Sequence, residues 1–552
     1  PHQNLLRPFT QAEVDLALSK CKNGKAAGLD DIRVEQIKNF GPITKAWLME
    51  LMNNCVQSCK IPKLWRKAKV IAIRKPGKDQ NDPKSYRPIS LLCHLYKLLE
   101  RLILHRLMEK LEEYTYHTGW LTGEELHISS DETYTAHRRW VSKERDHRSC
   151  IYRSDSSLRY CKQKIFLSNF RDKEADGDRK RMDYPRESVL APALFNIYTN
   201  DQPLPEGTQS FIYADDCAIT AQAHCFETVE ENLSKALREM SAYYRENQLR
   251  PNPGKTQTCA FHLKNRQAAR TLKITWENTT LEHCTYPKYL GVTLDRALTY
   301  KRHCLNTKQK VAARNNVIRK LTGTTWGAHP NTVRTSSLAL SYSAGEYASP
   351  VWFKSSHAKI VDVALNDTCR IITGCLKPTP LNKLYSLAGI APPDIRREVA
   401  AKSERGKSET SEAHPLYGHQ PANQRLKSRK SFLRSTEALV GTSQQCRTEL
   451  WRARYTGTAG WFTPCEKLPP GYTEKWSTWR SLNRLRSGVT KCKSNLVKWG
   501  FLVESPLCEC GATQTTSHLL QCTQCPATCT PEDLLHATPN AIQVANFWAS
   551  KV

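Results

Sequence analysis

The sequence contains no long hydrophobic run and does not begin like a secreted protein. No apolar stretch approaches the roughly 18 residues that a membrane-spanning helix needs, so we expect no membrane partner. The first residues, PHQNLLRPFT, are polar and show no signal peptide, so we expect an intracellular protein. Because the chain starts with Pro and not with Met, we also expect that residues are missing upstream.

Acidic residues are scarce relative to basic ones. The 552 residues include 53 Asp and Glu but 82 Lys and Arg, which gives a formal net charge of +29. An excess of this size favours a polyanionic partner, with nucleic acid as the first choice; the alternative is an ordinary protein with a basic, solvated surface. With 39% hydrophobic residues the chain is expected to fold, and its length predicts more than one domain.

Two adjacent acids interrupt an apolar stretch, FIYADDCAIT, at residues 211–220. The pattern favours a β-hairpin whose turn lifts Asp215 and Asp216 out of the core. Neighbouring carboxylates repel each other unless a cation is near, and Mg²⁺ prefers such oxygen ligands together with substrate phosphates. The pair is therefore a candidate Mg²⁺ site for phosphoryl transfer, although the letters YADD alone also fit a solvated surface turn.

Further segments occur in order on both sides of this pair. They are NGKAAGLDDIRVEQIK (23–38), AIRKPGKD and SYRPISLL before it, then VLAPALFNIYTNDQP (189–203), and, after it, NPGKT (252–256) and YPKYLGVTLD (286–295). LNRLRSGVTKCKSNLVKWG and CECGATQTTSHLLQC follow near the C-terminus. In this order the segments resemble motifs of the reverse transcriptases of non-LTR retrotransposons, in particular the jockey-like elements. The resemblance covers nearly the whole chain.

The resemblance implies an α+β fold of the right-hand polymerase type, with fingers, palm, a helical thumb and a small C-terminal zinc-knuckle module. The expected divisions are fingers and N-terminal helices at 1–114, a degraded fingers and palm segment at 115–188, the palm with the YADD hairpin and primer grip at 189–295, a helical thumb or connection at 296–400, a polar linker at 401–470 and the C-terminal tail at 471–552.

The activity that the resemblance implies is RNA-directed DNA polymerisation, in the cytoplasm and nucleus. A DNA primer 3′-hydroxyl would attack the α-phosphate of a dNTP on an RNA template, with two Mg²⁺ ions bound by Asp215 and Asp216. Lys75 and Arg87 match the fingers positions that grip the triphosphate, a task suited to cationic side chains. Lys255 matches a palm lysine proposed to protonate the leaving pyrophosphate. For all three cations an ordinary basic strand or turn is the alternative.

The same resemblance places a primer grip at Tyr289, Leu290 and Gly291. The segment that follows carries cations at roughly helical spacing, which would contact a nucleic-acid duplex through its phosphates: Lys301, Arg302, Lys308, Lys310 and Arg314. A solvated helix face is the alternative.

The third metal-binding acid of these enzymes is not present in a clean form. The segment IYRSDSSLRYC (151–161) offers Asp155 at the expected internal spacing, but Cys161 replaces the second acid of that motif. A competing alignment implies that the whole strand is deleted. Glu187 also stands where the family has a glycine, and its bulk and charge oppose nucleotide binding. We therefore expect an impaired polymerase; the alternative is a catalytically inactive remnant that only binds nucleic acid.

Most of the 21 Cys are expected to be reduced thiols, because no secretory signal is present. A C-terminal cluster is the exception, since four ligands within fifteen residues suit tetrahedral Zn²⁺: Cys508, Cys510, His518 and Cys522. The tail of the jockey-like elements carries the same pattern. We expect a structural zinc knuckle that helps to hold RNA or target DNA, with Cys525 and Cys529 as spare thiols. Unmetallated thiols in a polar tail are the alternative.

Overall fold

The computed structural model describes residues 7–115 and 188–550, apart from 76, 78, 215, 324–325, 413, 420–430, 456–461 and 465–466. Asp155, Asp215 and Glu187, singled out in the sequence, lie outside the described residues. The chain divides into two compact units. The first consists of the described segments up to Gln222 together with Lys235–Arg250, and the second includes Ala223–Ser234 and the chain from Pro251 onward.

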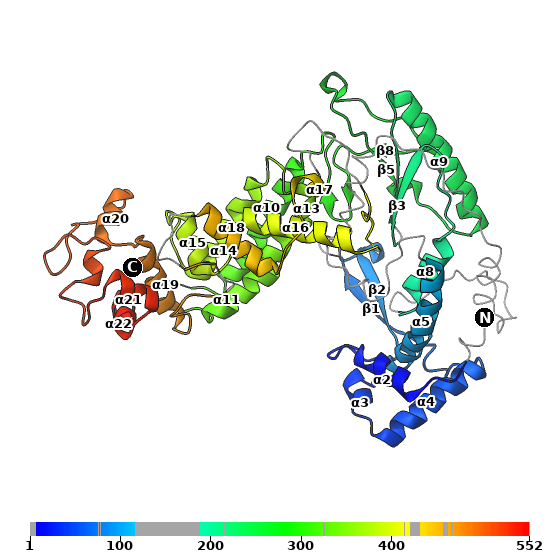
Figure 1. The fold of residues 1–552 in the computed structure, drawn as a ribbon, viewed down its shortest axis with the longest axis horizontal. Helices are drawn as coiled ribbons and strands as arrows, with labels where there is room; N and C mark the ends of the chain where they lie inside the picture. Colours follow the sequence, from blue (N-terminus) through cyan, green and yellow to red (C-terminus); the bar gives the residue numbers. More distant parts are fainter. Residues whose placement is uncertain are drawn as a thin grey trace. The chain divides into compact units, whose positions relative to one another are not determined.

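Amphipathic helices form the core of the first unit (Figure 1). They are α2 (Gln11–Ser19), the short α3 (Val34–Lys38), α4 (Pro42–Gln57) and α5 (His94–Thr115). Their buried apolar side chains form one cluster, which includes Val14, Leu18, Ile37, Leu48, Met52, Leu98 and Leu102. Burial of this apolar surface is the main stabilising contribution to the packing of these helices.

A buried arginine on α5 joins this helix to the start of α2. Arg106 Nε donates to Glu13 Oε1 at 2.9 Å, and Arg106 Nη2 donates to the Pro8 carbonyl at 3.0 Å. Thr10 and Glu13 form a capping box at the first turn of α2. Burial disfavours the ionised form of Glu13, but the hydrogen bonds from Arg106 and Thr10 outweigh it and lower the pKa of Glu13 to about 2. The carboxylate therefore stays ionised in the folded protein at neutral pH.

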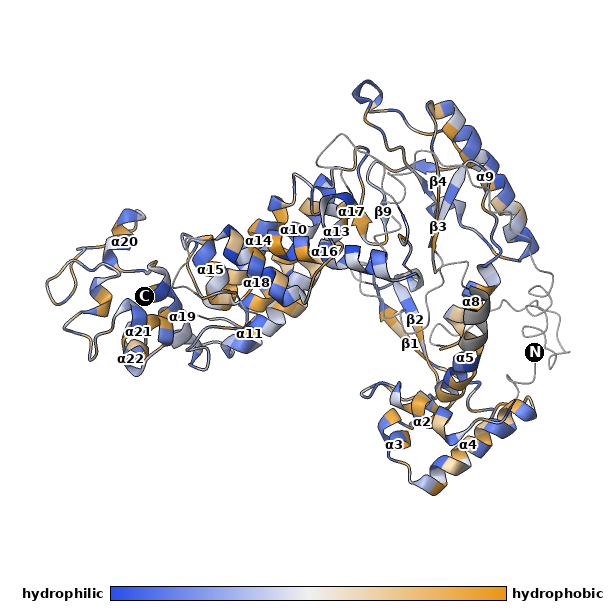
Figure 2. Cartoon of the chain, viewed as in Figure 1, coloured by the Kyte–Doolittle hydropathy of each residue, from blue (hydrophilic) through white to orange (hydrophobic). Residues whose placement is uncertain are grey.

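Two antiparallel hairpins belong to the first unit. One pairs β1 (Lys69–Arg74) with β2 (Tyr86–Leu91), and the other pairs β3 (Thr208–Tyr213) with β4 (Asp216–Ala221). The hydrophobic colour of β1 in Figure 2 corresponds to side chains that stay exposed, namely Val70, Ile71 and Ile73. Two helices flank the second hairpin in sequence, α8 (Ala191–Thr199) before it and α9 (Phe226–Glu246) after it.

The second unit begins with short strands and continues as a helical body. The strands are β5 (Gln257–Thr258), β6 (Thr275–Trp276), β7 (Thr279–Thr280), β8 (Glu282–His283), β9 (Lys288–Tyr289) and β10 (Val292–Thr293), paired as β5–β8, β6–β7 and β9–β10. The main helices of the body are α10 (Lys301–Arg319), α11 (Pro330–Ser337), α14 (Lys359–Thr373), α15 (Leu381–Ala388) and α16 (Pro393–Thr410).

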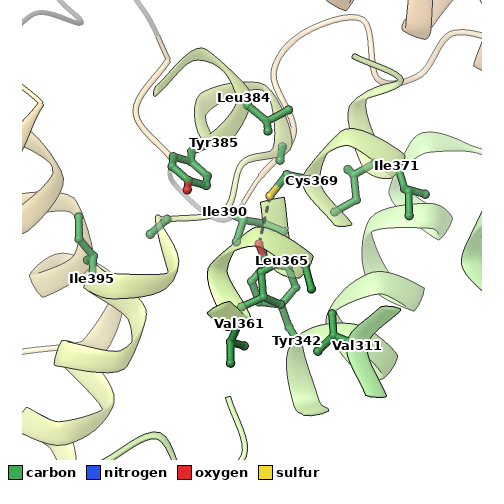
Figure 3. Close-up of a cluster of buried hydrophobic side chains, with 14 of the residues drawn as sticks. Val311, Tyr342, Val361, Leu365, Cys369, Ile371, Leu384, Tyr385, Ile390 and Ile395 are labelled. Carbon is green, nitrogen blue, oxygen red and sulfur yellow. Dashed lines mark hydrogen bonds between the residues drawn. The ribbon is translucent and has the colours of Figure 1, made fainter. Parts of the chain in front are cut away.

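A largely apolar core holds α10, α14 and their neighbours together, and Figure 3 shows part of it. Tyr342 and Cys369 are fully buried there, and the Tyr342 hydroxyl and Cys369 Sγ are 3.1 Å apart. The amide of Asn315 on α10 is also buried. It donates to the Ala364 carbonyl on α14 at 3.0 Å, and its oxygen accepts hydroxyl hydrogen bonds from Ser341 and Thr368, each at 2.8 Å. Each polar atom of this buried amide therefore has a partner.

Part of the segment 401–470, expected as a polar linker, is helical and packed. Helix α18 (Ser443–Arg454) packs against α16 and buries Cys446 and Trp451. Arg454 donates to Asp394 on α16 at 3.1 Å and also to Glu398. Many residues of α16 and α18 have the hydrophilic colour in Figure 2, which is why their sequence resembles a linker despite this packing.

The C-terminal residues have a small core of their own. It lies among α19 (Trp476–Ser487), α21 (Pro531–His536) and α22 (Pro539–Trp548). Trp548 Nε1 donates to the Leu519 carbonyl at 2.9 Å, which ties α22 to the expected knuckle. Trp479 Nε1 on α19 donates to the Ile372 carbonyl at the end of α14, at 3.0 Å. None of the described helices combines the length and the apolar character that crossing a bilayer requires.

The link between α2 and α5 gives a prediction for Glu13→Gln. At pH 7 the variant should lose about 1–2 kcal/mol of stability in the first unit, because Arg106 loses its charged acceptor. The pKa of Glu13 is lower in the folded protein than in the unfolded chain. Its ionised carboxylate therefore stabilises the folded state fully above the unfolded pKa of about 4.3, and this stabilisation is lost as the pH falls toward 2. Hydrogen exchange of the α2 amides, measured between pH 7 and pH 3, should show the difference from wild type shrinking over this range.

The matched control is Glu50→Gln, at an exposed position on α4. This substitution removes the same charge away from Arg106 and should leave the α2 amides as protected as in wild type. A Glu13→Gln variant whose exchange follows wild type at every pH would show that the ion pair does not stabilise this unit.

Candidate functional site

The β3–β4 hairpin carries the two candidate metal-binding acids. Tyr213 pairs with Asp216 at its closed end, and Ala214, which follows Tyr213, has a left-handed φ of 50°. The predicted hairpin is therefore present, and the side chain of Asp216 is exposed at the end of β4.

The stretch before α8 is fixed by a buried acid on α5. Glu100 is 2% exposed and accepts hydrogen bonds from Ser188 Oγ at 2.6 Å and from the Val189 N–H at 2.9 Å. Burial raises the pKa of Glu100, although the two donors favour its ionised form. No pattern in the sequence indicates this role, because Glu100 lies in an ordinary amphipathic helix, 88 residues from its partner Ser188.

The two cations proposed for the triphosphate, Lys75 and Arg87, lie on one hairpin. Arg87 is exposed and pairs with Ile73, while the Lys75 N–H donates to the Ser85 carbonyl at 2.7 Å and so extends the ladder by one position. Residues two apart on a strand share a face, and directly opposed residues do so too. Lys75 and Arg87 are therefore on the same face of the β1–β2 hairpin.

Lys255 lies in a short 3₁₀ turn, Pro253–Lys255, of the second unit. Its side chain is exposed, and the turn is closed by Thr256, whose hydroxyl donates to the Asn252 carbonyl at 3.0 Å. The turn thus presents the ammonium group to solvent.

The candidate primer grip is the turn between β9 and β10. Leu290 and Gly291 both have positive φ values, 45° and 86°. The Tyr347 hydroxyl donates to the Leu290 carbonyl at 3.0 Å, and a Cβ placed on Gly291 would lie 2.8 Å from the Tyr347 ring. The glycine is therefore required both by its backbone conformation and by the close approach of Tyr347. No sequence signal links Tyr347 to this turn.

A cavity of about 420 Å³ lies beside this turn. Its lining comes from the β9–β10 segment and from α10, and consists of Lys288, Gly291, Thr293, His303, Asn306, Thr307, Gln309, Lys310 and Ala313. Two cations and no acid line it, so its potential favours an anion. Burial, together with the charges of Lys310 and Lys288, lowers the pKa of His303 to about 4, so the imidazole is neutral at pH 7.

The remaining basic residues of α10 have different surroundings. Lys301, Arg302 and Lys308 are exposed, and the Arg302 guanidinium lies 5.8 Å from the centroid of the Tyr286 ring. Arg314 instead donates to the Leu340 carbonyl and, at 3.3 Å, to Ser343 Oγ. Arg314 therefore contributes to packing, whereas the exposed cations face solvent.

The C-terminal Cys and His residues come together in space. One ligand atom from each of Cys508, Cys510, His518 and Cys522 lies within 4.8 Å of the other three. The Sγ–Sγ distances are 3.7 Å for Cys508–Cys522 and 3.8 Å for Cys510–Cys522, and Cys510 Sγ is 3.3 Å from His518 Nε2. A tetrahedron with Zn–S bonds of ~2.3 Å has S–S edges of ~3.8 Å, so this donor set fits Zn²⁺.

Comparison with known proteins gives no match to any family model. Among curated proteins, the chain is 26% identical over 455 residues to the "Probable RNA-directed DNA polymerase from transposon BS" of Drosophila melanogaster, covering 72% of this chain and 49% of that protein. It is 25% identical over 430 residues to the "Probable RNA-directed DNA polymerase from transposon X-element" of the same species, covering 70% and 46%.

A further match is the "RNA-directed DNA polymerase from mobile element jockey" of Drosophila funebris, 28% identical over 348 residues, which are 56% of this chain and 37% of that protein. The chain thus spans about half the length of these relatives or less. The predicted resemblance is confirmed by these matches. The chain is similar, over more than half of its length, to RNA-directed DNA polymerases of the retrotransposons BS, X-element and jockey.

Proposed function

We propose that this chain is the polymerase part of a reverse transcriptase and adds nucleotides from dNTP to a DNA primer on an RNA template. The observation that carries the proposal is the β3–β4 hairpin, at whose closed end Tyr213 pairs with an exposed Asp216. The relatives named as RNA-directed DNA polymerases support the reaction class. Fingers, palm and thumb would correspond to 1–114, 189–295 and 296–400.

Asp215 and Asp216 would hold two Mg²⁺ ions. Two acids adjacent in sequence, of which Asp216 is exposed where the hairpin closes, fit this hard cation, which binds through one or two carboxylates together with substrate phosphates. When bound, Mg²⁺ stabilises the charge that develops on the attacking and leaving oxygens. Lys75 and Arg87, on one face of their hairpin, would orient the triphosphate by charge-assisted hydrogen bonds. Lys255 would deliver a proton to the departing pyrophosphate from its exposed turn.

The primer strand would lie along the β9–β10 turn and α10. Tyr289, Leu290 and Gly291 would support its end through the turn that Tyr347 holds in place. The acid-free cavity would take a backbone phosphate between Lys288 and Lys310. Lys301, Arg302 and Lys308 would add phosphate contacts that do not depend on sequence. Arg314, predicted from the sequence to bind nucleic acid, would do so only by giving up its contacts with Leu340 and Ser343.

The activity of this chain should be weak. A two-metal site normally needs a third carboxylate, and Asp155, the only candidate from the sequence, stands in a poorly matching segment. Glu187 replaces the glycine next to Ser188, and its negative charge would oppose a triphosphate. The alternative is a remnant that only binds nucleic acid. A primer-extension assay distinguishes it from a weak enzyme.

The C-terminal cluster would bind one structural Zn²⁺. The four ligands come from one short segment whose backbone is closed by the Cys508 N–H donating to Ala512 at 2.7 Å and the Gly511 N–H donating to Cys508 at 2.9 Å. Bound metal would therefore stabilise this loop, as in other short zinc modules.

Primer extension on poly(rA)·oligo(dT) with Mg²⁺ tests the polymerase proposal. Asp216→Asn should reduce dNTP incorporation by about 10³-fold or more, because a metal ligand is lost from the site. Glu206→Gln, in the exposed turn before β3, removes an equal charge and should extend the primer like wild type.

A wild-type chain that binds the primer–template but incorporates no dNTP would support the remnant instead. If the wild-type chain does extend the primer, Asp155→Asn separates the two interpretations of the third acid. Loss of the residual activity would identify Asp155 as the missing ligand, and unchanged activity would support deletion of that strand.

Lys310→Gln tests the phosphate contact at the cavity. The variant should bind a primer–template more weakly, and the slope of log K against log salt should decrease in magnitude by about 1, because one ionic contact is lost. The control is Lys377→Gln, an exposed lysine after α14. An unchanged salt slope for Lys310→Gln would place the nucleic acid elsewhere.

Metal analysis of the purified chain tests the zinc site. We expect one Zn²⁺ per chain, lost on Cys522→Ser and retained on Cys525→Ser, because Cys525 is also buried but is not part of the four-ligand cluster. Folded wild-type protein that carries no zinc, or a Cys525→Ser variant that loses it, would contradict the ligand assignment.

A further inference from the structure

The C-terminal module exposes aromatic side chains that no packing requirement explains. Helix α20 (Lys493–Lys498) buries none of its residues, and the turn after it leaves Trp499 36%, Phe501 61% and Leu502 105% exposed. Val497 in the last turn of the helix is 48% exposed. Single exposed apolar residues are normal, but exposed apolar residues that lie next to one another often mark an interaction surface.

The turn holds these side chains in a defined position. The Phe501 N–H donates to the Leu496 carbonyl and the Gly500 N–H to the Val497 carbonyl, each at 3.0 Å. Gly500 has a φ of 78°, the left-handed conformation that ends many helices. Trp499 and Phe501 therefore flank the glycine of a hydrogen-bonded helix end, and their exposure is part of the local fold.

The segment that carries the metal-ligand cluster contacts the first turn of α20 through Gln514. Gln514 Oε1 accepts from the Lys493 N–H at 2.9 Å, and the Gln514 carbonyl accepts from the Ser494 N–H at 3.2 Å. Gln514 Nε2 also lies 3.6 Å from Cys508 Sγ. The first turn of α20 is thus attached to the same loop that carries the metal-ligand cluster.

The charge around this surface is positive. Residues 489–503 include Lys491, Lys493 and Lys498 and contain no acid. Lys493 Nζ donates a hydrogen bond to the Leu507 carbonyl at 2.7 Å, while Lys491 and Lys498 are exposed. Cations next to exposed aromatic rings are the combination with which proteins bind single strands, because the rings stack on unpaired bases and the cations follow the backbone.

We infer that α20 and the turn Trp499–Leu502 form a stacking surface for unpaired bases of single-stranded nucleic acid. Trp499 and Phe501 would each take one base, and Lys498 and Lys491 would contact neighbouring phosphates. A membrane surface also attracts aromatic and basic residues, but the amphipathic helices that bind membranes are much longer than the six residues of α20. This inference shares one element with the proposed function, namely that the partner is nucleic acid.

Fluorescence anisotropy with a labelled single-stranded RNA of uridines, titrated with the full chain, tests this surface. The double variant Trp499→Ala/Phe501→Ala should bind at least tenfold more weakly, with an unchanged slope of log K against log salt, because stacking releases no counterions. Lys498→Gln should reduce the magnitude of that slope by about 0.7, the value for one ionic contact with a single strand. Trp499→Phe/Phe501→Tyr keeps both rings and should bind within about threefold of wild type.

Leu502→Ala is the matched control for hydrophobic contact in general. It removes the most exposed apolar side chain of the turn but no ring, and should leave RNA binding unchanged. Thermal unfolding of every variant checks that the module still folds. Ultraviolet cross-linking of wild type to the same RNA should map to the peptide that contains Trp499 and Phe501.

Wild-type RNA affinity in a folded double alanine variant would overturn the inference. Binding to vesicles of neutral and anionic phospholipid that requires Trp499 and Phe501, with RNA binding unaffected, would also overturn it and assign the surface to a membrane. Ring-dependent RNA binding by a chain that extends no primer would support this surface while the polymerase proposal fails, so the two outcomes are separable.

Discussion

The helical body of the second unit depends on one buried amide. Asn315 lies on the inner face of α10, and its side chain bonds α14 through Ala364 and Thr368 and the neighbouring turn through Ser341. A buried amide without these partners would cost on the order of 1–3 kcal/mol per unsatisfied group. The network therefore restricts how α10 can rotate, and with it which residues of α10 face the core and which face solvent. His303 and Val311 are buried on the same helix, while Lys301 and Lys308 remain exposed.

Net charge alone overstates the surface that can meet a polyanion. Arg106, Arg397 and Arg486 are almost fully buried and bind partners of the fold: Glu13, Asp362 and backbone carbonyls near α21. Burial lowers the pKa of Arg486 to about 9, so even this group is charged at neutral pH, but its charge is directed at protein carbonyls. The cations that can attract nucleic acid are those left exposed, on the β1–β2 hairpin, on α10 and around α20. The proposed polyanion partner therefore depends on these exposed cations more than on the total of +29.

Local patterns were the most predictable part of this protein. The apolar stretches around Asp215 and Asp216 form the expected hairpin, and the spacing of Cys508, Cys510, His518 and Cys522 is sufficient to bring four ligand atoms together. Both depend on contacts close in sequence, for which turn geometry and ligand spacing are enough. The segment 401–470 was harder to interpret because α16 and α18 present mainly polar residues and are stabilised by packing on each other and by Arg454. Few large aliphatic residues in a segment do not exclude a packed helix.

The sequence by itself determined the relationship to retrotransposon polymerases, the positive charge, the acid pair and the C-terminal ligand set, because each is written in the identity and order of residues. Tertiary structure alone decided which distant groups support them. Tyr347 restrains the turn at Gly291 from 56 positions away, Glu100 on α5 holds Ser188, and Gln514 attaches α20 to the loop of the cluster. Such contacts arise only when separate segments fold against one another, and the chemistry of a tyrosine, a glutamate or a glutamine does not specify which backbone group it will meet.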